Sequence, residues 1–275
     1  DTDRSRGLGD VYKRQDQVWR KGCMEEIKDY YFSPIDGRTA KLIAYAASFG
    51  IDKWAYSKKE TRFCTQKLKE FTAVSVREDS GMELCKRHLN HTAEHVLDPT
   101  MLLTPADYRA LIGEGGAEKY ANKITAFILD RSDDKLAALK KVSKVLAMDY
   151  NFAATETEDR LAPLEKRIAP SVADWLKAMY YADFIFTDSF HGCVFSILFN
   201  KPFVLYVNRN RGVARFDSLL KLFKIENRTL SDSNGLESCP IRQSIDWKPI
   251  NAKLEEMRSK SMCFLENALT ARDEQ

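Results

Sequence analysis

A compact set of residues that can do chemistry lies in the second half of the chain: Asp188, Ser189, His191 and Gly192. An imidazole can contact a phosphate or carboxylate, and it can move a proton near neutral pH. The unpaired N–H groups and the dipole of a helix start attract anions. We therefore predict an anion-binding site with His191 as its catalytic group. The residues alone leave a second interpretation open, in which Ser189 only caps a helix and His191 is a polar surface residue.

The elements that must position this set form a strand–helix–strand unit. The apolar run 184–186 predicts a buried strand, residues 187–189 turn the chain, and the apolar-periodic segment 194–199 predicts a helix. A second apolar run at 203–207 predicts the next strand. Ligands of open α/β sheets bind outside the carboxyl ends of the strands. The polar set follows the end of the first strand, and Gly192 lets a ligand or a neighbouring backbone approach closely there.

Arg77 occupies a similar place in the first half of the chain. It follows the predicted strand 71–76 directly, within the run Ser75-Val76-Arg77-Glu78. A guanidinium at a strand end can hold a carboxylate or a phosphate through two parallel hydrogen bonds. The alternative is an ion pair with Glu78 or Asp79 at the rim of the sheet.

Three further arginines, Arg209, Arg211 and Arg215, lie in a glycine-bearing segment before a predicted helix at 215–223. Such a segment can fold over an anionic ligand, and Arg211 and Arg215 are predicted to bind substrate. A solvated basic loop is the plain alternative.

Other known kinds of site have less support. His88, His91 and His95 have an HxxHxxxH spacing, but Asn90 and the strand predicted after it argue against one continuous helix, so no metal site is predicted. The chain contains no GxxxxGK[ST], GxGxxG or GxSxG motif. Nicotinamide enzymes and hydrolases with a nucleophile elbow are therefore disfavoured, and no cofactor is predicted.

Strands and helices alternate along the chain, which predicts an α/β fold with largely parallel sheets covered on both faces. The further predicted strands are 41–48, 95–97 and 123–129, and the further predicted helices are 58–69, 81–89, 133–148, 172–181 and 251–271.

Composition places the protein in an ordinary globular class. The 43 basic and 40 acidic residues are well mixed, so no basic face for a nucleic acid is predicted. No apolar run approaches the roughly 18 residues of a membrane helix, and the N-terminus does not resemble a secretory signal. The six scattered cysteines are expected to be reduced and mostly buried. These features predict a cytoplasmic protein.

The ends of the chain differ from the rest. Residues 1–15 lack periodicity and resemble translated adaptor sequence, so they are predicted to be a non-native leader. We expect an N-terminal domain over 16–116 and a second domain over 117–250, with a short linker at 114–118. A charged helix within 251–275 is expected to pack back on the first domain.

With these residues in place, the chain resembles the polysaccharide pyruvyl transferase family. Seven segments carry the resemblance in the family's order: 16–19 (DQVW), 45–50 (YAASFG), 75–78 (SVRE), 96–100 (VLDPT), 171–176 (SVADWL), 187–192 (TDSFHG) and 215–220 (RFDSLL).

The resemblance implies a glycosyltransferase-B-like fold of two Rossmann-like domains, with the first domain truncated at its N-terminus. It implies transfer of a pyruvyl group from phosphoenolpyruvate to a pair of sugar hydroxyls, as a ketal, on a bacterial surface polysaccharide or its lipid-linked precursor. His191 would transfer a proton or contact the phosphate, Arg77 would hold the anion, and Arg215 would add positive charge near the phosphate. A peripheral position at the inner membrane face would suit a lipid-linked acceptor.

One position departs from the family pattern. Some members carry arginine and leucine immediately before the histidine, where this chain has Ser189 and Phe190. Two other functions therefore stay open, a nucleotide-sugar-dependent glycosyltransferase and a catalytically silent glycan-binding module.

Overall fold

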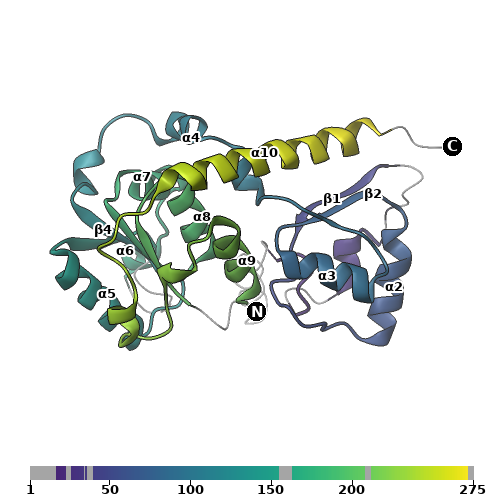
Figure 1. Cartoon of the computed structure of the whole chain (residues 1–275), viewed down its shortest axis with the longest axis horizontal. Coiled ribbons are helices and arrows are strands. Elements are labelled where there is room, and N and C mark those ends of the chain that lie inside the picture. The colour runs from purple at the N-terminus through teal and green to yellow at the C-terminus, as the bar shows by residue number, and fades with distance from the viewer. Residues whose placement is uncertain are drawn as a thin grey trace. The chain divides into compact units, whose positions relative to one another are not determined.

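The computed structural model describes residues 17–22, 26–33, 35, 40–154, 163–207 and 212–271 (Figure 1). The chain forms two compact units. Unit 1 contains Asp1–Leu102, Asn210–Phe223 and Lys253–Gln275, and unit 2 contains Leu103–Arg209 and Lys224–Ala252. The predicted leader 1–15 lies outside the described residues. The domain ranges inferred from sequence stay a prediction.

Unit 1 is built on a parallel three-stranded sheet in the order β1-β2-β3. Its strands are β1 (Leu42–Ala47), β2 (Phe71–Val76) and β3 (Glu94–His95), and its helices include α2 (Lys58–Leu68), α3 (Asp79–His88) and α9 (Ala214–Phe223). The short 3-10 helices η1 (Ile27–Tyr31) and η2 (Pro99–Leu102) complete it.

Local sequence explains several features of unit 1. A capping box of Ser57 and Glu60 begins α2, because each side chain satisfies a backbone N–H of the other's position. Strand β1 has an irregular register with β2, and Ala46 has a positive φ of 53° there. The Ser75 hydroxyl accepts a hydrogen bond from Ala46 N and donates one to Ala44 O, both at 3.0 Å, so it fills the gap in the ladder.

The core of unit 1 is largely aromatic. The Trp19 ring is almost fully buried and stacks on Tyr31 with 4.9 Å between ring centroids. Trp19 N also donates to Ser48 O at 2.9 Å, which ties this segment to the end of β1.

Unit 2 is built on a parallel five-stranded sheet in the order β5-β4-β6-β7-β8. The strands are β4 (Lys123–Phe127), β5 (Asp149–Phe152), β6 (Phe184–Thr187), β7 (Phe203–Tyr206) and β8 (Thr229–Leu230). The helices are α4 (Pro105–Ile112), α5 (Asp133–Leu146), α6 (Leu164–Arg167), α7 (Val172–Tyr181) and α8 (Phe190–Leu198), with short 3-10 helices η3 (Ala117–Lys119), η5 (Glu226–Arg228) and η6 (Gly235–Ser238).

The strand order of unit 2 defines a topological switch point. The chain passes from β4 outward to β5 on one side and then continues with β6 on the other side. The loops after β4 and β6 therefore diverge, and open α/β sheets bind ligands in the crevice that such divergence leaves. Residues 188–192 follow β6 and so lie at this switch point.

The predicted mixed α/β class with parallel sheets is confirmed. The predicted strand 71–76 and helix 172–181 have the observed bounds, whereas α3 begins two residues earlier than expected and α8 begins at Phe190. The helices α4 and α6 and the strands β5 and β8 were not predicted, and neither were the short 3-10 helices. Both missed strands are short and lie at or near the edge of the sheet, where the apolar pattern is weak.

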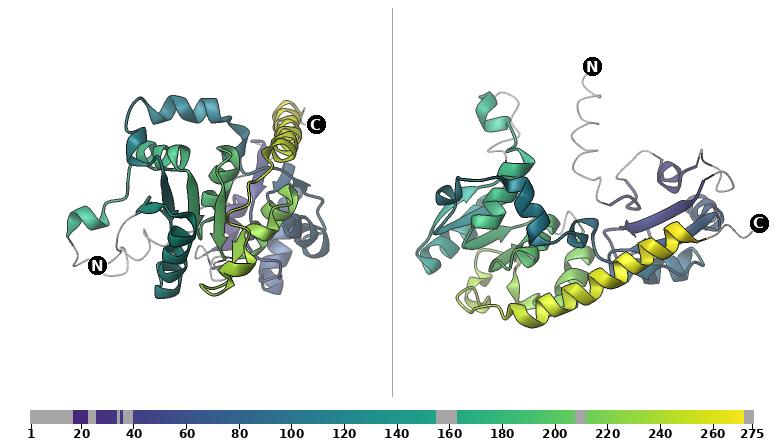
Figure 2. Two further views of the ribbon diagram at one scale, coloured as in Figure 1. Left: turned by 60° about the vertical axis from the view of Figure 1, so that its left-hand side comes forward. Right: turned by 90° about the horizontal axis from the view of Figure 1, so that it is seen from above.

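The last element, α10 (Trp247–Thr270), is one unbroken helix (Figures 1 and 2). Its residues from Lys253 onward belong to unit 1, where Ser261 Oγ accepts a hydrogen bond from Leu97 N at 3.0 Å and Phe264 packs against Tyr45. None of the described helices combines the length and the apolar character that crossing a membrane requires.

The described cysteines are free thiols. Cys64, Cys85, Cys193 and Cys239 are buried, and Cys263 is exposed. Burial raises the pKa of the Cys64 and Cys85 thiols to about 12, so both stay protonated near neutral pH.

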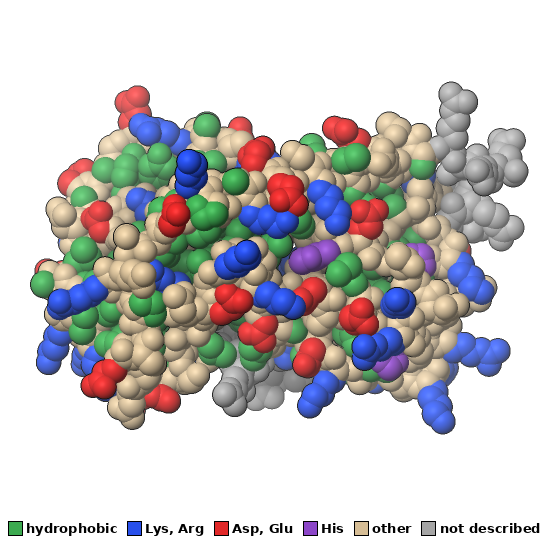
Figure 3. All heavy atoms as spheres, viewed as in Figure 1, with side chains coloured by type: hydrophobic (Ala, Val, Ile, Leu, Met, Phe, Trp, Pro, Cys, Tyr) green, Lys and Arg blue, Asp and Glu red, His purple; other side chains and the backbone are tan. Residues whose placement is uncertain are grey.

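On the face shown in Figure 3, acidic and basic side chains are interspersed.

Candidate active site

The corner between β6 and α8 is organised around Thr187, the last residue of β6. The Thr187 hydroxyl donates to Phe127 O on β4 at 2.7 Å and accepts a hydrogen bond from Ser189 N at 3.0 Å. It therefore connects two neighbouring strand ends and fixes the turn into α8. Thr187, Asp188 and Ser189 are all buried, so this turn is rigidly packed.

Gly192 is required by packing at the same corner. A Cβ atom on this residue would lie 2.1 Å from Thr187 Oγ1 and 2.7 Å from Thr187 Cβ. Real Cβ atoms do not approach other atoms so closely, so only glycine lets α8 lie against the end of β6. We expected either a ligand or a neighbouring backbone to approach Gly192 closely, and the residue that approaches it is Thr187, at the end of β6.

Asp188 joins the two loops of the switch point. Its carboxylate accepts hydrogen bonds from Leu129 N at 2.7 Å and Asp130 N at 3.2 Å, both in the loop after β4. It also accepts one from Lys135 Nζ at 2.7 Å, in an ion pair whose Asp side chain is fully buried. Lys135 Nζ further donates to Asp130 O at 2.7 Å. The observed contacts of this carboxylate fix the loop after β4 against the loop after β6.

Ser189 and His191 begin α8. Ser189 is the N-cap residue, but its side chain makes no capping hydrogen bond, so the simple capping interpretation is not what the structure shows. The imidazole of His191 is half-buried, in the first turn of the helix, and contacts the Phe190 ring edge-on at 5.5 Å. It is the one side chain of α8 that is not buried. A half-buried imidazole in the first turn of a helix can bind an anion and exchange a proton with it.

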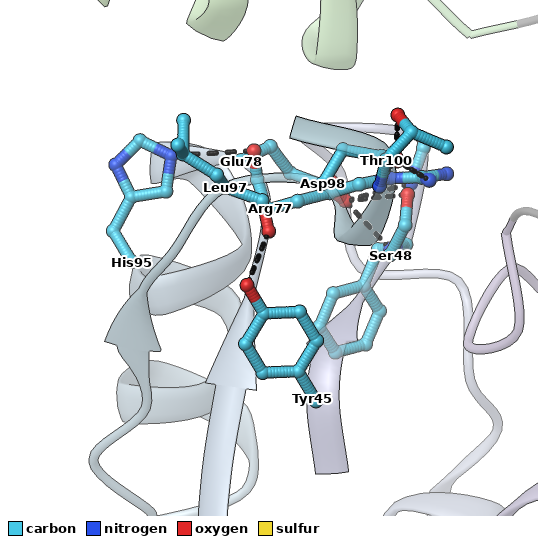
Figure 4. Close-up of polar contacts among 10 residues, drawn as sticks. Tyr45, Ser48, Arg77, Glu78, His95, Leu97, Asp98 and Thr100 are labelled. Atoms are coloured by element: carbon cyan, nitrogen blue, oxygen red, sulfur yellow. Dashed lines mark hydrogen bonds and ion pairs between the residues drawn. The ribbon is translucent and has the colours of Figure 1, made fainter. Parts of the chain in front are cut away.

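Arg77 directly follows β2 in unit 1 and forms an ion pair with Asp98, which lies shortly after β3 (Figure 4). Arg77 Nη1 is 2.6 Å from Asp98 Oδ2, and the side chains are only 4% and 2% exposed. The other oxygen of Asp98 accepts from Thr100 N at 3.0 Å and from its hydroxyl at 2.7 Å. The alternative interpretation placed Arg77 in an ion pair with Glu78 or Asp79 at the rim, whereas its observed carboxylate partner is the buried Asp98.

Glu78 is fully buried beside Arg77 (Figure 4). Its Oε1 accepts hydrogen bonds from Ser48 Oγ, Phe49 N and Gly50 N at 3.0, 2.7 and 3.0 Å. Burial raises the pKa of the Glu78 carboxyl, while the charge of Arg77 and the hydrogen bonds from Gly50 and Ser48 oppose that rise.

Arg215, in the first turn of α9, is also buried in unit 1 and lowers the pKa of Glu78 by its charge. The helix is tied to the end of β2 because Asp79 N donates to Ser218 Oγ at 3.0 Å. The predicted binding residue Arg211 lies outside the described residues, as does Arg209.

The three clustered histidines lie on different elements. His88 ends α3 and stacks on Trp54 at 4.6 Å, whereas His95 is in β3 with its Nε2 3.2 Å from Arg77 O. Burial lowers the pKa of His91 and of His95. The described residues contain no group of three or more side chains suited to a metal ion.

The structure thus brings the predicted residues into two sets. Asp188, Ser189, His191 and Gly192 form one corner of unit 2, whereas Arg77 and Arg215 lie in unit 1, where the charge of each lowers the pKa of Glu78. Two charged partners, Lys135 and Asp98, were not predicted, and Glu78 was considered only as an ion-pair partner of Arg77. Glu78 and Asp98 belong to segments 75–78 and 96–100, which carry the family resemblance, so the sequence did mark both residues. Nothing near Lys135 in the sequence indicates its partner.

Residues 9–210 match the model of the polysaccharide pyruvyl transferase family. The chain belongs to that family. The protein is therefore a transferase, and the family's activity is the transfer of a pyruvyl group to polysaccharide. The matched range includes Arg77 and the β6–α8 corner but ends before Arg215. A search of curated proteins finds no match to the chain.

Proposed function

We propose that this polysaccharide pyruvyl transferase uses phosphoenolpyruvate as its donor. In the proposed reaction, the donor's methylene carbon gains a proton and two hydroxyls of one sugar bond to its C2 carbon. The C2–oxygen bond to phosphate breaks, and inorganic phosphate leaves with the remaining proton. The product is a pyruvate ketal on a surface polysaccharide or its lipid-linked precursor. Family membership over residues 9–210 is the observation that carries this proposal.

The chemistry of the donor fits the side chains that the two units present. Phosphoenolpyruvate carries a carboxylate and a phosphate, which arginines and helix N-termini bind well. We assign Arg77, Arg211 and Arg215 to the anionic groups, and the β6–α8 corner with Asp188, Ser189 and Gly192 to the positioning of the donor. His191 is the proposed proton-transfer group, since the reaction requires a general acid and base.

The proposal includes a glycosyltransferase-B-like arrangement, in which two Rossmann-like domains serve one reaction. It also includes a bacterial, cytoplasmic setting, with a peripheral position at the inner membrane face where the acceptor is lipid-linked. The acceptor is then a glycan or a lipid-linked oligosaccharide. The parallel sheets of both units, with functional residues after their strands, support this arrangement.

The direct test combines calorimetric titration with a mass-spectrometric product assay. We expect phosphoenolpyruvate to bind, and we expect a sugar acceptor to gain the mass of a pyruvate ketal. Binding of nucleotide sugars without phosphoenolpyruvate would instead establish the glycosyltransferase alternative.

His191→Ala tests the catalytic assignment. Loss of a general acid–base group costs about 10²–10⁴-fold in turnover, with folding preserved. His91→Ala is the matched control, because His91 is also half-buried but follows the end of α3 rather than a strand. Unchanged ligand binding and turnover in His191→Ala would favour the silent glycan-binding module.

A further inference from the structure

Glu78 has an unusual hydrogen-bonding pattern for a fully buried carboxyl group. Oε1 accepts all three of its hydrogen bonds, and two of the donors are the backbone N–H groups of Phe49 and Gly50. Oε2 is buried and has no hydrogen-bond partner among the described residues. A buried carboxyl group is costly, so its retention here calls for a role beyond packing.

The turn that Glu78 holds is in backbone contact with the segment leading into α9. Gly212 has a φ of +85°, and a Cβ atom on it would lie 2.1 Å from Gly50 O. Gly50 itself has a φ of +68°, and a Cβ atom there would lie 1.9 Å from Gln17 Oε1. Gly212 tolerates no side chain because the atom it would meet is backbone, and at Gly50 the positive φ disfavours a side chain.

Arg215 follows Gly212 by three residues and stands in the first turn of α9. Its charge acts on the Glu78 carboxyl, and Asp79 N, next in the chain to Glu78, donates to Ser218 on the same helix. Glu78 therefore accepts hydrogen bonds from the turn after β1, and its carboxyl group is within the electrostatic influence of Arg215. The backbone contact between Gly50 and Gly212 connects the turn at residues 48–50 to the start of α9, where Arg215 lies.

We propose that Glu78 is a positioning residue that fixes the turn at residues 48–50 and, through Gly212, places Arg215 to hold an anionic group of the donor. This inference rests on the proposed function, because it concerns the same donor. Glu78 does not need to touch the donor in this role. Its carboxyl group orients a guanidinium that does.

Donor titrations on single and double variants test the functional part. With phosphoenolpyruvate as the titrant, Arg215→Ala and Glu78→Ala are each expected to weaken binding about tenfold or more, as for a lost hydrogen bond to a charged group. The double variant should bind no more weakly than Arg215→Ala alone, because Glu78 acts through Arg215. Losses that multiply would overturn the proposal. Glu83→Ala, an exposed residue of α3 paired with Arg87, is the control.

Gly212→Ala provides a second variant in case Glu78→Ala does not fold. It leaves Glu78 and its three hydrogen bonds in place but breaks the contact with Gly50 O. We expect the same tenfold loss of donor affinity. Wild-type affinity in this variant would contradict the proposed path through Gly212.

Hydrogen exchange tests the positioning without any ligand. In Glu78→Ala, or in Glu78→Gln if the alanine variant is unstable, the amides of Gly50 and of the first turn of α9 should exchange faster together. Faster exchange at Gly50 alone, or at neither place, would overturn the positioning role. If the wild-type protein fails to bind phosphoenolpyruvate, the proposed donor is wrong, and this exchange measurement still decides whether Glu78 positions α9.

Discussion

The turn after β2 in unit 1 and the turn after β6 in unit 2 have the same local construction with different chemistry. Each strand is followed by two residues and a helix, and each helix has a glycine as its third residue, Gly81 in α3 and Gly192 in α8. A Cβ atom on either glycine would press on the last residue of the preceding strand, Val76 or Thr187. Neither N-cap side chain makes a capping hydrogen bond.

The difference lies in what occupies the two linking positions. Unit 1 has Arg77 and Glu78, whose buried side chains are held by Asp98 and by the turn at residues 48–50. Unit 2 has Asp188, which is neutralised by Lys135, and Ser189. The same strand–turn–helix geometry thus carries a network of buried ionisable side chains in unit 1. In unit 2 it places a half-buried histidine in the first helical turn. Shared backbone geometry positions such residues but does not determine their chemistry.

The largest effect is expected from Asp188→Asn. The substitution leaves Lys135 as a buried charge without its partner, which costs about 3–5 kcal/mol of unfolding free energy. Urea unfolding gives the measurement, and the double variant Asp188→Asn with Lys135→Met should recover much of the loss because no buried charge then remains. A single variant as stable as the wild type would show that this ion pair does not hold the switch point.

A smaller loss is expected from Gly192→Ala, and it should exceed that of Gly81→Ala. The new Cβ would lie 2.1 Å from Thr187 Oγ1 in α8 but 3.1 Å from Val76 Cβ in α3. Overpacking of this kind costs about 1–3 kcal/mol, so we expect the α8 variant at the upper end and the α3 variant at or below the lower end. Thermal or urea unfolding of both variants checks the order, and a reversed order would contradict the assigned packing.

The pH dependence of stability separates the two turns further. The pKa of Glu78 is raised in the folded protein. Glu78 therefore contributes its full stabilisation at pH values below its unfolded-state pKa, and this stabilisation is lost as the pH rises through the folded-state pKa. Glu78→Gln removes this loss, so the variant should gain stability relative to the wild type as pH increases. The unfolded-state pKa of a glutamate is about 4. If the unfolding free energies of the two proteins change in parallel above this pH, the pKa of Glu78 is not raised in the folded protein.

The smallest effect is expected from Ser189→Ala. Its side chain makes no capping hydrogen bond, so its loss should cost less than about 0.5 kcal/mol. Ser171 accepts a hydrogen bond from Asp174 N at 3.1 Å at the start of α7, and Ser171→Ala should cost about 1 kcal/mol. Comparable losses in the two variants would show that Ser189 caps α8 after all.

The sequence predicted the parts of the fold that have strong local signals. The strand 71–76 is a run of apolar and β-branched residues, and the helix 172–181 follows the capping residue Ser171, so both were located correctly. The edge strands β5 and β8 are short and mixed in character, and so they had no such pattern. The start of α8 was also located correctly, because Ser189 was expected at the cap position and His191 in the first turn.

By itself, the sequence determined the α/β class and the family, and it indicated two sets of candidate residues. These follow from local periodicity and from residue types in a fixed order, which need no knowledge of distant contacts. Only the tertiary structure determined the partners, because the Arg77–Asp98 and Lys135–Asp188 pairs join residues that are far apart along the chain. Burial, which raises the pKa of Glu78 and makes Gly192 essential, likewise depends on which segments the fold brings together.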